Sequence, residues 1–492
     1  MNKRNANAVR KAGAVVGVLA GALGASCASP VTYVRPAEPS QTRYVATAVA
    51  ASTPATGAAQ DVPHVSFGAA PPDAWWTLLG SDQINGLVSL ALANNQSLVS
   101  AQAHLGAARE RIRAAQGAWY PQLDIAAGAQ RTRYGAPMLG SLAKDFPPYS
   151  AYAVGPTVSY DVDLFGGTRS RVEQATAEAQ YESARLQAAG LSVSGNVVIE
   201  AVQIATLRAQ IRVALGIIAD DERTLSLIRA ARDAGAVSDM DVLSAQSQTD
   251  HDRTLLPPLR QELSVAQDVL SSLVGEAPSD WTAPDVELDS LQLAKELPVV
   301  LPSELVHRRP DITTAEAQLH AASATLGIAT ANLYPHLTLS AAIGEQGLLG
   351  GGPSEAAFDL LAGLTAPVFH GGTLTAERRA ARDEYQAAFA AYRQTILDAF
   401  SQVAGSLQAL TNDADSLNAQ RHALESASAS LSLTRQAYAA GKAGYVQVLD
   451  AQRLDQQARL GEVQENGQRY VDVVKLLLAA GGRVDLPAAD RP

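Results

Sequence analysis

The feature that most constrains this chain is a segment of about 22 residues that it carries twice. Residues 225–246 and 431–452 share the pattern Leu-Ser-Leu-x-Arg, then a glycine, then Val-Leu-x-Ala-Gln, at identical spacing. The copies lie about 206 residues apart, and about half of the aligned positions match. Each copy predicts an Ala-rich helix, a glycine that ends it in the left-handed conformation (Gly235 or Gly441), a short turn and a second helix. The chain is therefore predicted to contain one helical hairpin made twice.

The composition supports close-packed helices, and the net charge argues against two kinds of interaction. With 492 residues, size alone would suggest about three domains, but the duplication overrides that expectation. Aromatic residues make up only 5% of the chain, which suits helices better than one large globular core. The formal net charge is -11, and residues 1–26 contain four basic and no acidic residues, so the remainder is more acidic still. This charge argues against nucleic acid and against a polybasic membrane surface.

The N-terminus indicates export. Residues 1–26 have the basic start, apolar run and small residues of a secretory signal peptide. Cys27, the only cysteine, follows at the place where a lipoprotein signal is cut, although Gly24 stands where a lipobox normally has leucine. An ordinary cleavage next to an unmodified thiol is the alternative. We favour lipidation, because a lone cysteine in an exported chain cannot form an internal disulfide, and one lipid would anchor the end without spanning a bilayer.

Beyond the signal, the sequence shows no run of about 20 apolar residues, so we expect no transmembrane helix. Two regions instead alternate with period two. The first is a hairpin from residue 121 to residue 163, and the second places strands at residues 337–343 and 358–369. Each has one apolar and one polar face, as in the set Tyr152, Val154, Val158, Tyr160 and Val162. The pattern fits a membrane hairpin with lipid on one side, and it equally fits a soluble sheet.

The helices have unequal lengths. Residues 167–234, and about 70 residues from residue 371, each predict a helix of about 100 Å. Residues 239–274 predict a helix of only about 54 Å, with a kink or restart at Pro257-Pro258. Residues 96–118 add about 35 Å, so two short helices stacked end to end can flank one long helix.

Each half therefore runs helix, β-hairpin, long helix, shorter helix. Four strands cannot close a barrel around a lumen, so several copies must contribute strands to one barrel. The predicted segments are a signal peptide (1–26), a lipid-anchored linker and equatorial segment (27–80), short helices (81–120), a barrel hairpin (121–163), a long helical hairpin (164–274), an inter-repeat segment (275–310), a short helix (311–334), a second barrel hairpin (335–369), a second long helical hairpin (370–480) and a tail (481–492).

Several motifs now point to one family. From Trp75-Trp76 to about Gly482, the chain resembles outer-membrane efflux channels of the TolC/OprM type, and most closely their NodT-like lipoprotein branch. The motifs are Trp75-Trp76, Leu256-Pro257-Pro258-Leu259, Leu301-Pro302-Ser303-Glu304-Leu305, Arg309-Pro310-Asp311-Ile312, Ala315-Glu316, Leu333-Tyr334-Pro335 and the duplicated Val-Leu-x-Ala-Gln.

The resemblance implies a mainly α protein with a β-barrel. Three subunits would each give four strands to a 12-stranded outer-membrane barrel, continued by a periplasmic α-helical barrel. The implied partners are a homotrimer, a periplasmic adaptor (membrane fusion) protein, an inner-membrane transporter of RND type and outer-membrane lipid. The implied function is passive export of small molecules. Two alternatives stay open: a channel for type I protein secretion, and a periplasmic coiled-coil scaffold that never crosses the membrane.

No pattern predicts an enzyme, a cofactor or a metal site. The eight histidines are scattered without His-x-x-Glu-His spacing, and Gly441-Lys442-Ala443 lacks the features of a phosphate loop. We expect residues 347–352 to form a flexible surface loop, and Arg308-Arg309 to hold a helix junction.

The resemblance also suggests working residues at the helical tips. Tyr438, Gln447 and Asp450 fall where related channels place their periplasmic gate, and Asp241 is the first-repeat counterpart of Gln447. Three Asp450 side chains would form a ring that attracts cations. The alternative is helix capping, which we favour for Asp241 but not for Asp450. The predicted adaptor-docking residues are Gly235, Val242, Leu243, Gly441, Val448 and Leu449.

Overall fold

The computed structural model describes residues 32–37, 39–45, 63–133 and 147–486, so the predicted signal peptide and Cys27 lie outside the described residues. The chain forms two compact units. The first contains Gly106–Tyr181, Glu316–Ala391 and described residues up to Pro36. The second contains Ala37–Leu105, Glu182–Ala315 and the chain from Tyr392 onward. Each unit draws on both halves of the sequence, because each long helix runs through both units.

The two long helices have equal lengths, as the duplication predicts. Helix α5 spans Gly167–Asp233 and helix α10 spans Thr373–Ala439, 67 residues each or about 100 Å. Contrary to our expectation, α5 contains a stretch long and apolar enough to cross a membrane, with a mean hydropathy of 1.3. Because 56% of that stretch is buried, its apolar residues are explained by packing as in a core helix.

The shorter helices are split in the first half and continuous at the end of the second. Helices α2 (Asp82–Asn94) and α3 (Gln96–Gly117) precede the first hairpin. After α5, helix α6 (Asp239–Arg253) stops and α7 (Leu256–Leu273) restarts, with prolines in its first turn where no N–H is needed. This confirms the predicted restart. In the second half the corresponding helices are α9 (Pro310–Ala331) and α11 (Tyr445–Ala479).

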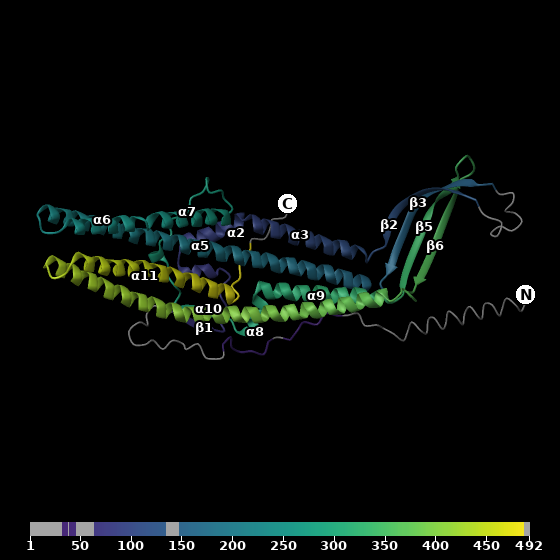
Figure 1. The fold of residues 1–492 in the computed structure, drawn as a ribbon. Coiled ribbons are helices and arrows are strands. Elements are labelled where there is room, and N and C mark those ends of the chain that lie inside the picture. Colours follow the sequence, from purple (N-terminus) through teal and green to yellow (C-terminus); the bar gives the residue numbers. More distant parts are fainter. Residues whose placement is uncertain (1–31, 38, 46–62, 134–146, 487–492) are drawn as a thin grey trace, which may run out of the picture. The chain divides into compact units, whose positions relative to one another are not determined.

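The first unit contains a four-stranded antiparallel sheet (Figure 1). Its strands are β2 (Gln122–Thr132), β3 (Tyr149–Val162), β5 (His336–Leu348) and β6 (Glu355–Thr365), in the order β2-β3-β5-β6. The sequence pattern placed the last strand three to four residues too late, and β5 runs through Gly347 into the segment expected to be a loop. The two predicted hairpins therefore pair directly with each other.

The second unit contains a small parallel sheet that the sequence analysis missed. Strand β1 (His64–Phe67) pairs with β4 (Glu296–Val299), in segments predicted to be a linker and irregular. Four residues are too few to show a period of two, and both partners of this pairing are far apart in the chain. Helix α8 (Pro302–Arg308) follows β4.

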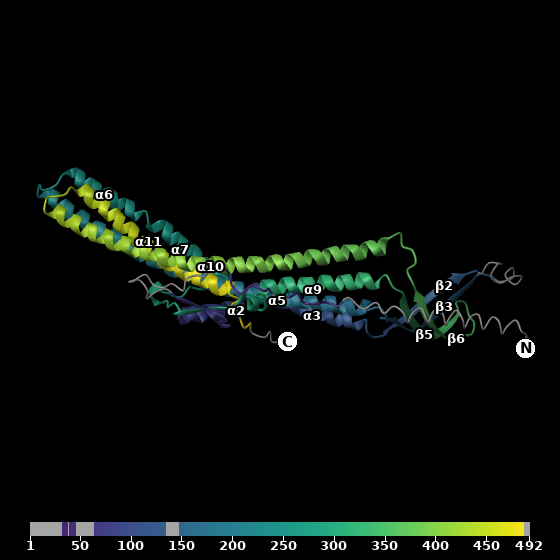
Figure 2. The ribbon, with the colours of Figure 1, turned by 90° about the horizontal axis from the view of Figure 1, so that it is seen from below.

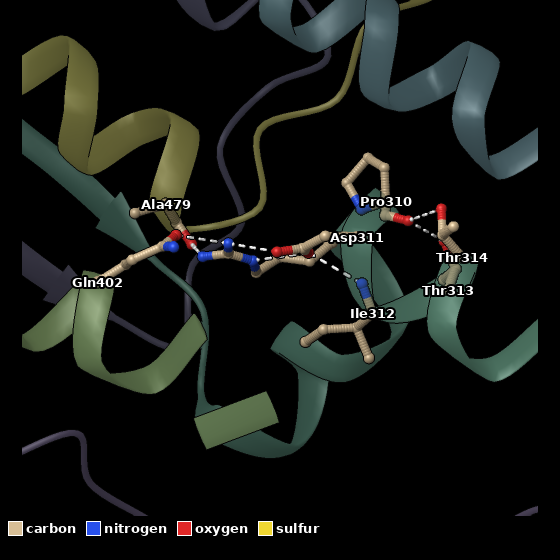
Figure 3. Close-up of polar contacts among 8 residues, drawn as sticks. Pro310, Asp311, Ile312, Thr313, Thr314, Gln402 and Ala479 are labelled. Atoms are coloured by element: carbon tan, nitrogen blue, oxygen red, sulfur yellow. Dashed lines mark hydrogen bonds and ion pairs between the residues drawn. The ribbon is translucent and has the colours of Figure 1, made fainter. Parts of the chain in front are cut away.

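Arg308 and Arg309 hold a helix junction, as predicted. The buried Arg309 guanidinium donates to both Asp311 carboxylate oxygens, at 3.0 and 2.6 Å, and to the Ala479 carbonyl at 3.1 Å (Figure 3). It also donates to Gln402 Oε1 at 2.7 Å. One side chain thus joins the start of α9 to α10 and to the end of α11. Beside it, Arg308 donates to the carbonyls of Gly481 and Pro71.

Candidate functional site

The helical tip is built by two turns with the same hydrogen bonds. After α5, the Gly235 N–H donates to the Arg232 carbonyl and the Ala236 N–H to the Ala231 carbonyl, both at 2.8 Å. After α10, Gly441 and Lys442 repeat these bonds to the Tyr438 and Ala437 carbonyls. Both glycines have positive φ, 73° and 69°. This is the Schellman motif, in which a left-handed glycine satisfies the last carbonyls of a helix.

The two helices that leave these turns are also capped alike. Asp241 accepts hydrogen bonds from the Ser238 N–H and hydroxyl, at 3.1 and 2.9 Å, while its own N–H donates to the Ser238 hydroxyl. Gln447 Oε1 accepts from the Gly444 N–H at 2.6 Å. Two of the four predicted gate residues are therefore occupied as helix caps in this chain. This supports the capping interpretation of Asp241 and extends it to Gln447.

A shared apolar cluster fills the tip between the α5–α6 and α10–α11 hairpins, which lie next to each other (Figures 1 and 2). Helices α6 and α11 are in contact. All four helices contribute: Leu225, Ile228, Ala245, Leu431, Tyr445, Val448 and Ala451. The ring of Tyr438 packs against this cluster, with its centroid 5.6 Å from that of Tyr445. Burial, and then the nearby Asp241 carboxylate, raise the pKa of Tyr438 above its usual value.

Two predicted tip residues differ sharply in exposure. Val448 is only 2% exposed and belongs to the cluster, so its side chain is not offered to a partner, contrary to the docking prediction. Val242 and Leu449 are half-buried against the same cluster. Leu243, by contrast, is 69% exposed. Asp450 is also exposed and lies 3.3 Å from Arg453, one turn further along α11.

The sheet of the first unit separates apolar from polar residues across all four strands. Residues paired directly across antiparallel strands lie on the same face of the sheet. One row joins Leu123, Val158, Ala341 and Leu360, and the adjacent row joins Asp124, Thr157, Ala342 and Asp359. In these two rows the register continues the predicted alternation over all four strands, whereas further along Glu345 pairs with Val154 on the apolar face. One face suits lipid and the other suits water.

Comparison with known proteins identifies the fold and the family. The model of the family described as "Outer membrane efflux protein" matches residues 87–276 and 301–482. The chain belongs to the outer membrane efflux protein family. The pyoverdine export outer membrane protein OpmQ of Pseudomonas aeruginosa is 32% identical over 422 residues, which cover 83% of this chain and 87% of OpmQ. The outer membrane protein OprJ of the same species is 28% identical, with 94% of each chain covered.

Solved structures agree. The outer-membrane channel OprN is 25% identical and superposes with a TM-score of 0.82, covering 92% of this chain and 99% of OprN. The predicted fold class and outer-membrane location are therefore confirmed. The protein is an outer-membrane efflux channel, a transport duct, and the scaffold interpretation is excluded by the same relatives.

Sequence reasoning missed a layer of buried polar side chains beside the tip cluster. Asp221 in α5 and Asp252 in α6 are 3% and 2% exposed. The signal was present, because the positions about 206 residues later, Ala427 and Ala458, carry alanine. An aspartate in one copy at a position where the other has a small apolar residue marks a place where the repeats diverge.

The two faces of the sheet predict opposite tolerances to charge at neighbouring alanines of β5. Ala341→Arg places a cation between Val158 and Leu360 on the apolar face. Because that face meets lipid, the substitution should lower the free energy of unfolding by about 2–4 kcal/mol. Ala342→Arg, between Thr157 and Asp359, is the matched control and should cost about 1 kcal/mol or less. Urea unfolding in lipid vesicles measures both, and equal losses would contradict the assignment of faces.

Proposed function

We propose that three copies of this chain assemble into one export duct. Each copy gives β2, β3, β5 and β6 to a 12-stranded barrel, and the long helices continue the duct through the periplasm. The single observation that carries this proposal is the sheet itself. Strands β2 and β6 are its edges, and only another strand can satisfy their backbone groups within lipid. Four strands are too few to close around a lumen, so the partner strands come from neighbouring copies.

The duct receives small molecules from an inner-membrane transporter of RND type through a periplasmic adaptor. The functions for which relatives are named support small cargo: pyoverdine export for OpmQ, toluene efflux for TtgF of Pseudomonas putida, and cation efflux for CusC of Escherichia coli. Secretion of whole proteins is the alternative. Deletion of the gene is the test, because accumulation of a fluorescent dye inside the cells favours efflux, whereas loss of a secreted protein with normal dye export favours secretion.

The gate proposal now rests mainly on Asp450. Its carboxylate is exposed beside the Gly441 turn, with Arg453 as its neighbour on the same helix. In a trimer, three such carboxylates converge on the axis and attract cations. Tyr438 lies just before the turn and packs on the tip cluster. Asp241 and Gln447 cap the first turns of α6 and α11, and α11 carries Asp450.

Removal of the Asp450 carboxylate should raise resting conductance and weaken cation preference several-fold. The measurement is single-channel conductance and reversal potential of purified Asp450→Ala in planar bilayers. Asp239→Ala removes another exposed tip acid, paired with Arg232 in the first repeat, and is expected to leave both quantities unchanged. The gate role is wrong if Asp450→Ala behaves like this control.

Leu243 is the best candidate for adaptor contact among the predicted docking residues, because its apolar side chain projects from the tip. Gly235 and Gly441 act indirectly by shaping the turns, and the half-buried Val242 and Leu449 border the surface. Burial of one leucine is worth about 1.5–3 kcal/mol. Leu243→Asp should therefore weaken adaptor binding at least about tenfold in surface plasmon resonance. Leu397→Asp, an exposed leucine far from the turns, is the control and should bind normally.

The position of Tyr33 against α9 is compatible with a lipid on Cys27 that inserts into the membrane. Tyr33 stacks on His320 of α9 with centroids 4.3 Å apart, and Arg35 pairs with Glu316 at 2.7 Å. Five residues lie between Cys27 and Tyr33, and the six Cα–Cα steps that join them span at most about 21 Å. His320 lies about 16 Å along α9 from its end at Ala331, where the chain turns toward the sheet.

Lipidation is tested by labelling with radioactive palmitate. The wild-type chain should carry label in the outer-membrane fraction, and Cys27→Ser should carry none, because a serine hydroxyl replaces the acceptor thiol. Arg35→Ala, which removes the ion pair to Glu316 and keeps the acceptor thiol of Cys27, should keep the label. An unlabelled wild-type chain would refute the lipid anchor and leave the barrel proposal standing.

A further inference from the structure

A polar layer lies one helical turn from the apolar tip cluster. It consists of Asp221 in α5, Thr249 and Asp252 in α6, and Gln452 and Gln456 in α11, all between 0% and 7% exposed. Asp221 precedes Leu225 by four residues, Thr249 follows Ala245 by four, and Gln452 follows Val448 by four. The layer therefore sits in the interior of the same four-helix arrangement.

The layer joins the first-repeat hairpin to α11. Gln452 Nε2 donates to Asp221 Oδ1, and Gln456 Nε2 donates to Asp252 Oδ2 at 2.9 Å. A third amide, Gln248 of α6, donates to the same Asp252 oxygen at 2.9 Å. Two carboxylates of the α5–α6 hairpin are thus bound by two amides of α11. These hydrogen bonds would have to break if α11 moved away from that hairpin.

The two carboxylates lack a neutralising ion pair in the described part of the chain. The buried Asp455 offers a contrast, since it accepts from Arg459 at 2.7 Å and from Ser428. The Oδ2 atom of Asp221 has no hydrogen-bond partner among the described residues. Two close carboxylates that share one proton satisfy such an atom, because the protonated oxygen becomes a donor to its neighbour.

Every packed element presents a charged or titratable group here. Burial first, and then the neighbouring Asp252 carboxylate of α6, raise the pKa of Asp221 well above its usual range. Asp220 of α5 acts in the same direction, whereas Arg435 of α10 opposes the rise. On α11, Tyr445 is the facing group, and burial followed by Asp221 raises its pKa to about 12, so it stays neutral.

We propose that Asp221 and Asp252 share one proton that latches α11 to the α5–α6 hairpin, and that loss of this proton loosens the tip. The closed layer binds one proton more than a hydrated, loosened layer. Rising pH therefore increases the population of the loosened state. Between the pKa of a solvated aspartate and the raised pKa of Asp221, the loosened fraction grows by up to about tenfold per pH unit. Only its consequence for export rests on the proposed channel function.

The test measures the distance between α6 and α11 directly in the full-length purified protein. Spin labels at Ser247→Cys and Gln457→Cys, both exposed, report this distance at about pH 5.5 and about pH 8.5. The parent should show a narrow distribution at the lower pH and a broader, longer one at the higher pH. The distribution of Asp221→Asn should stay narrow at both pH values, because its amide can donate to the Asp252 carboxylate without a shared proton.

Asp220→Asn is the matched control, since it removes the adjacent, more exposed acid of α5 and should keep the full pH response. Asp252→Asn is a second variant that also removes titration, and circular dichroism at the lower pH shows that each variant is folded. The latch is refuted if the parent distance does not change with pH, or if either folded layer variant keeps the parent response.

Bilayer conductance of the same proteins separates the latch from the channel proposal. Asp450 is present in all of them, so its effect on conductance is common to every trace. Conductance should rise with pH in the parent and in Asp220→Asn, and stay flat in Asp221→Asn. A pH-dependent distance in a protein that never conducts would support the latch and refute the channel. Conductance that rises equally in Asp221→Asn would refute the latch and leave the channel intact.

Discussion

The rest of the molecule depends on the hydrogen-bonding needs of an open β-sheet in lipid. Backbone groups at the edges of β2 and β6 have no water to bind inside a bilayer, so each edge requires a strand from another copy. The row Leu123, Val158, Ala341 and Leu360 makes one face compatible with lipid across all four strands at this level of the sheet. In the proposed assembly, insertion of the sheet into lipid therefore depends on strands from neighbouring copies.

Duplication makes the two halves of the chain alike, but the acids proposed to act at the tip lie where the copies diverge. The turns at Gly235 and Gly441 make the same Schellman bonds, and Asp241 and Gln447 cap the following helices at equivalent positions. Asp450 and the Asp221–Asp252 layer have no equivalent acid in the other copy. The common scaffold holds the tip together, and the acids that occur in only one copy give its two hairpins different electrostatic environments.

Patterns of local origin were predictable from the sequence, whereas pairings between distant segments were not. The strand faces, the long helices and the glycine turns each follow from residues a few positions apart. The β1–β4 pairing joins residues 64–67 to residues 296–299, which no local period encodes. The burial of Val448 at the tip likewise depends on contacts with segments far away in the sequence. Its place beside Leu449 suggested a docking surface, but the opposite hairpin covers it with Leu225 and Ile228.

A buried polar layer is an unfavourable way to stabilise a helical bundle, since apolar side chains of similar volume usually hold helices at least as firmly. The second copy shows that alanine is accommodated at the equivalent site, where Ala458 is 6% exposed in α11. In the proposed latch, the two carboxylates make the contact with α11 depend on the protonation of the pair. The apolar cluster below the layer keeps the hairpins registered in either state, so a loosened tip remains a folded one.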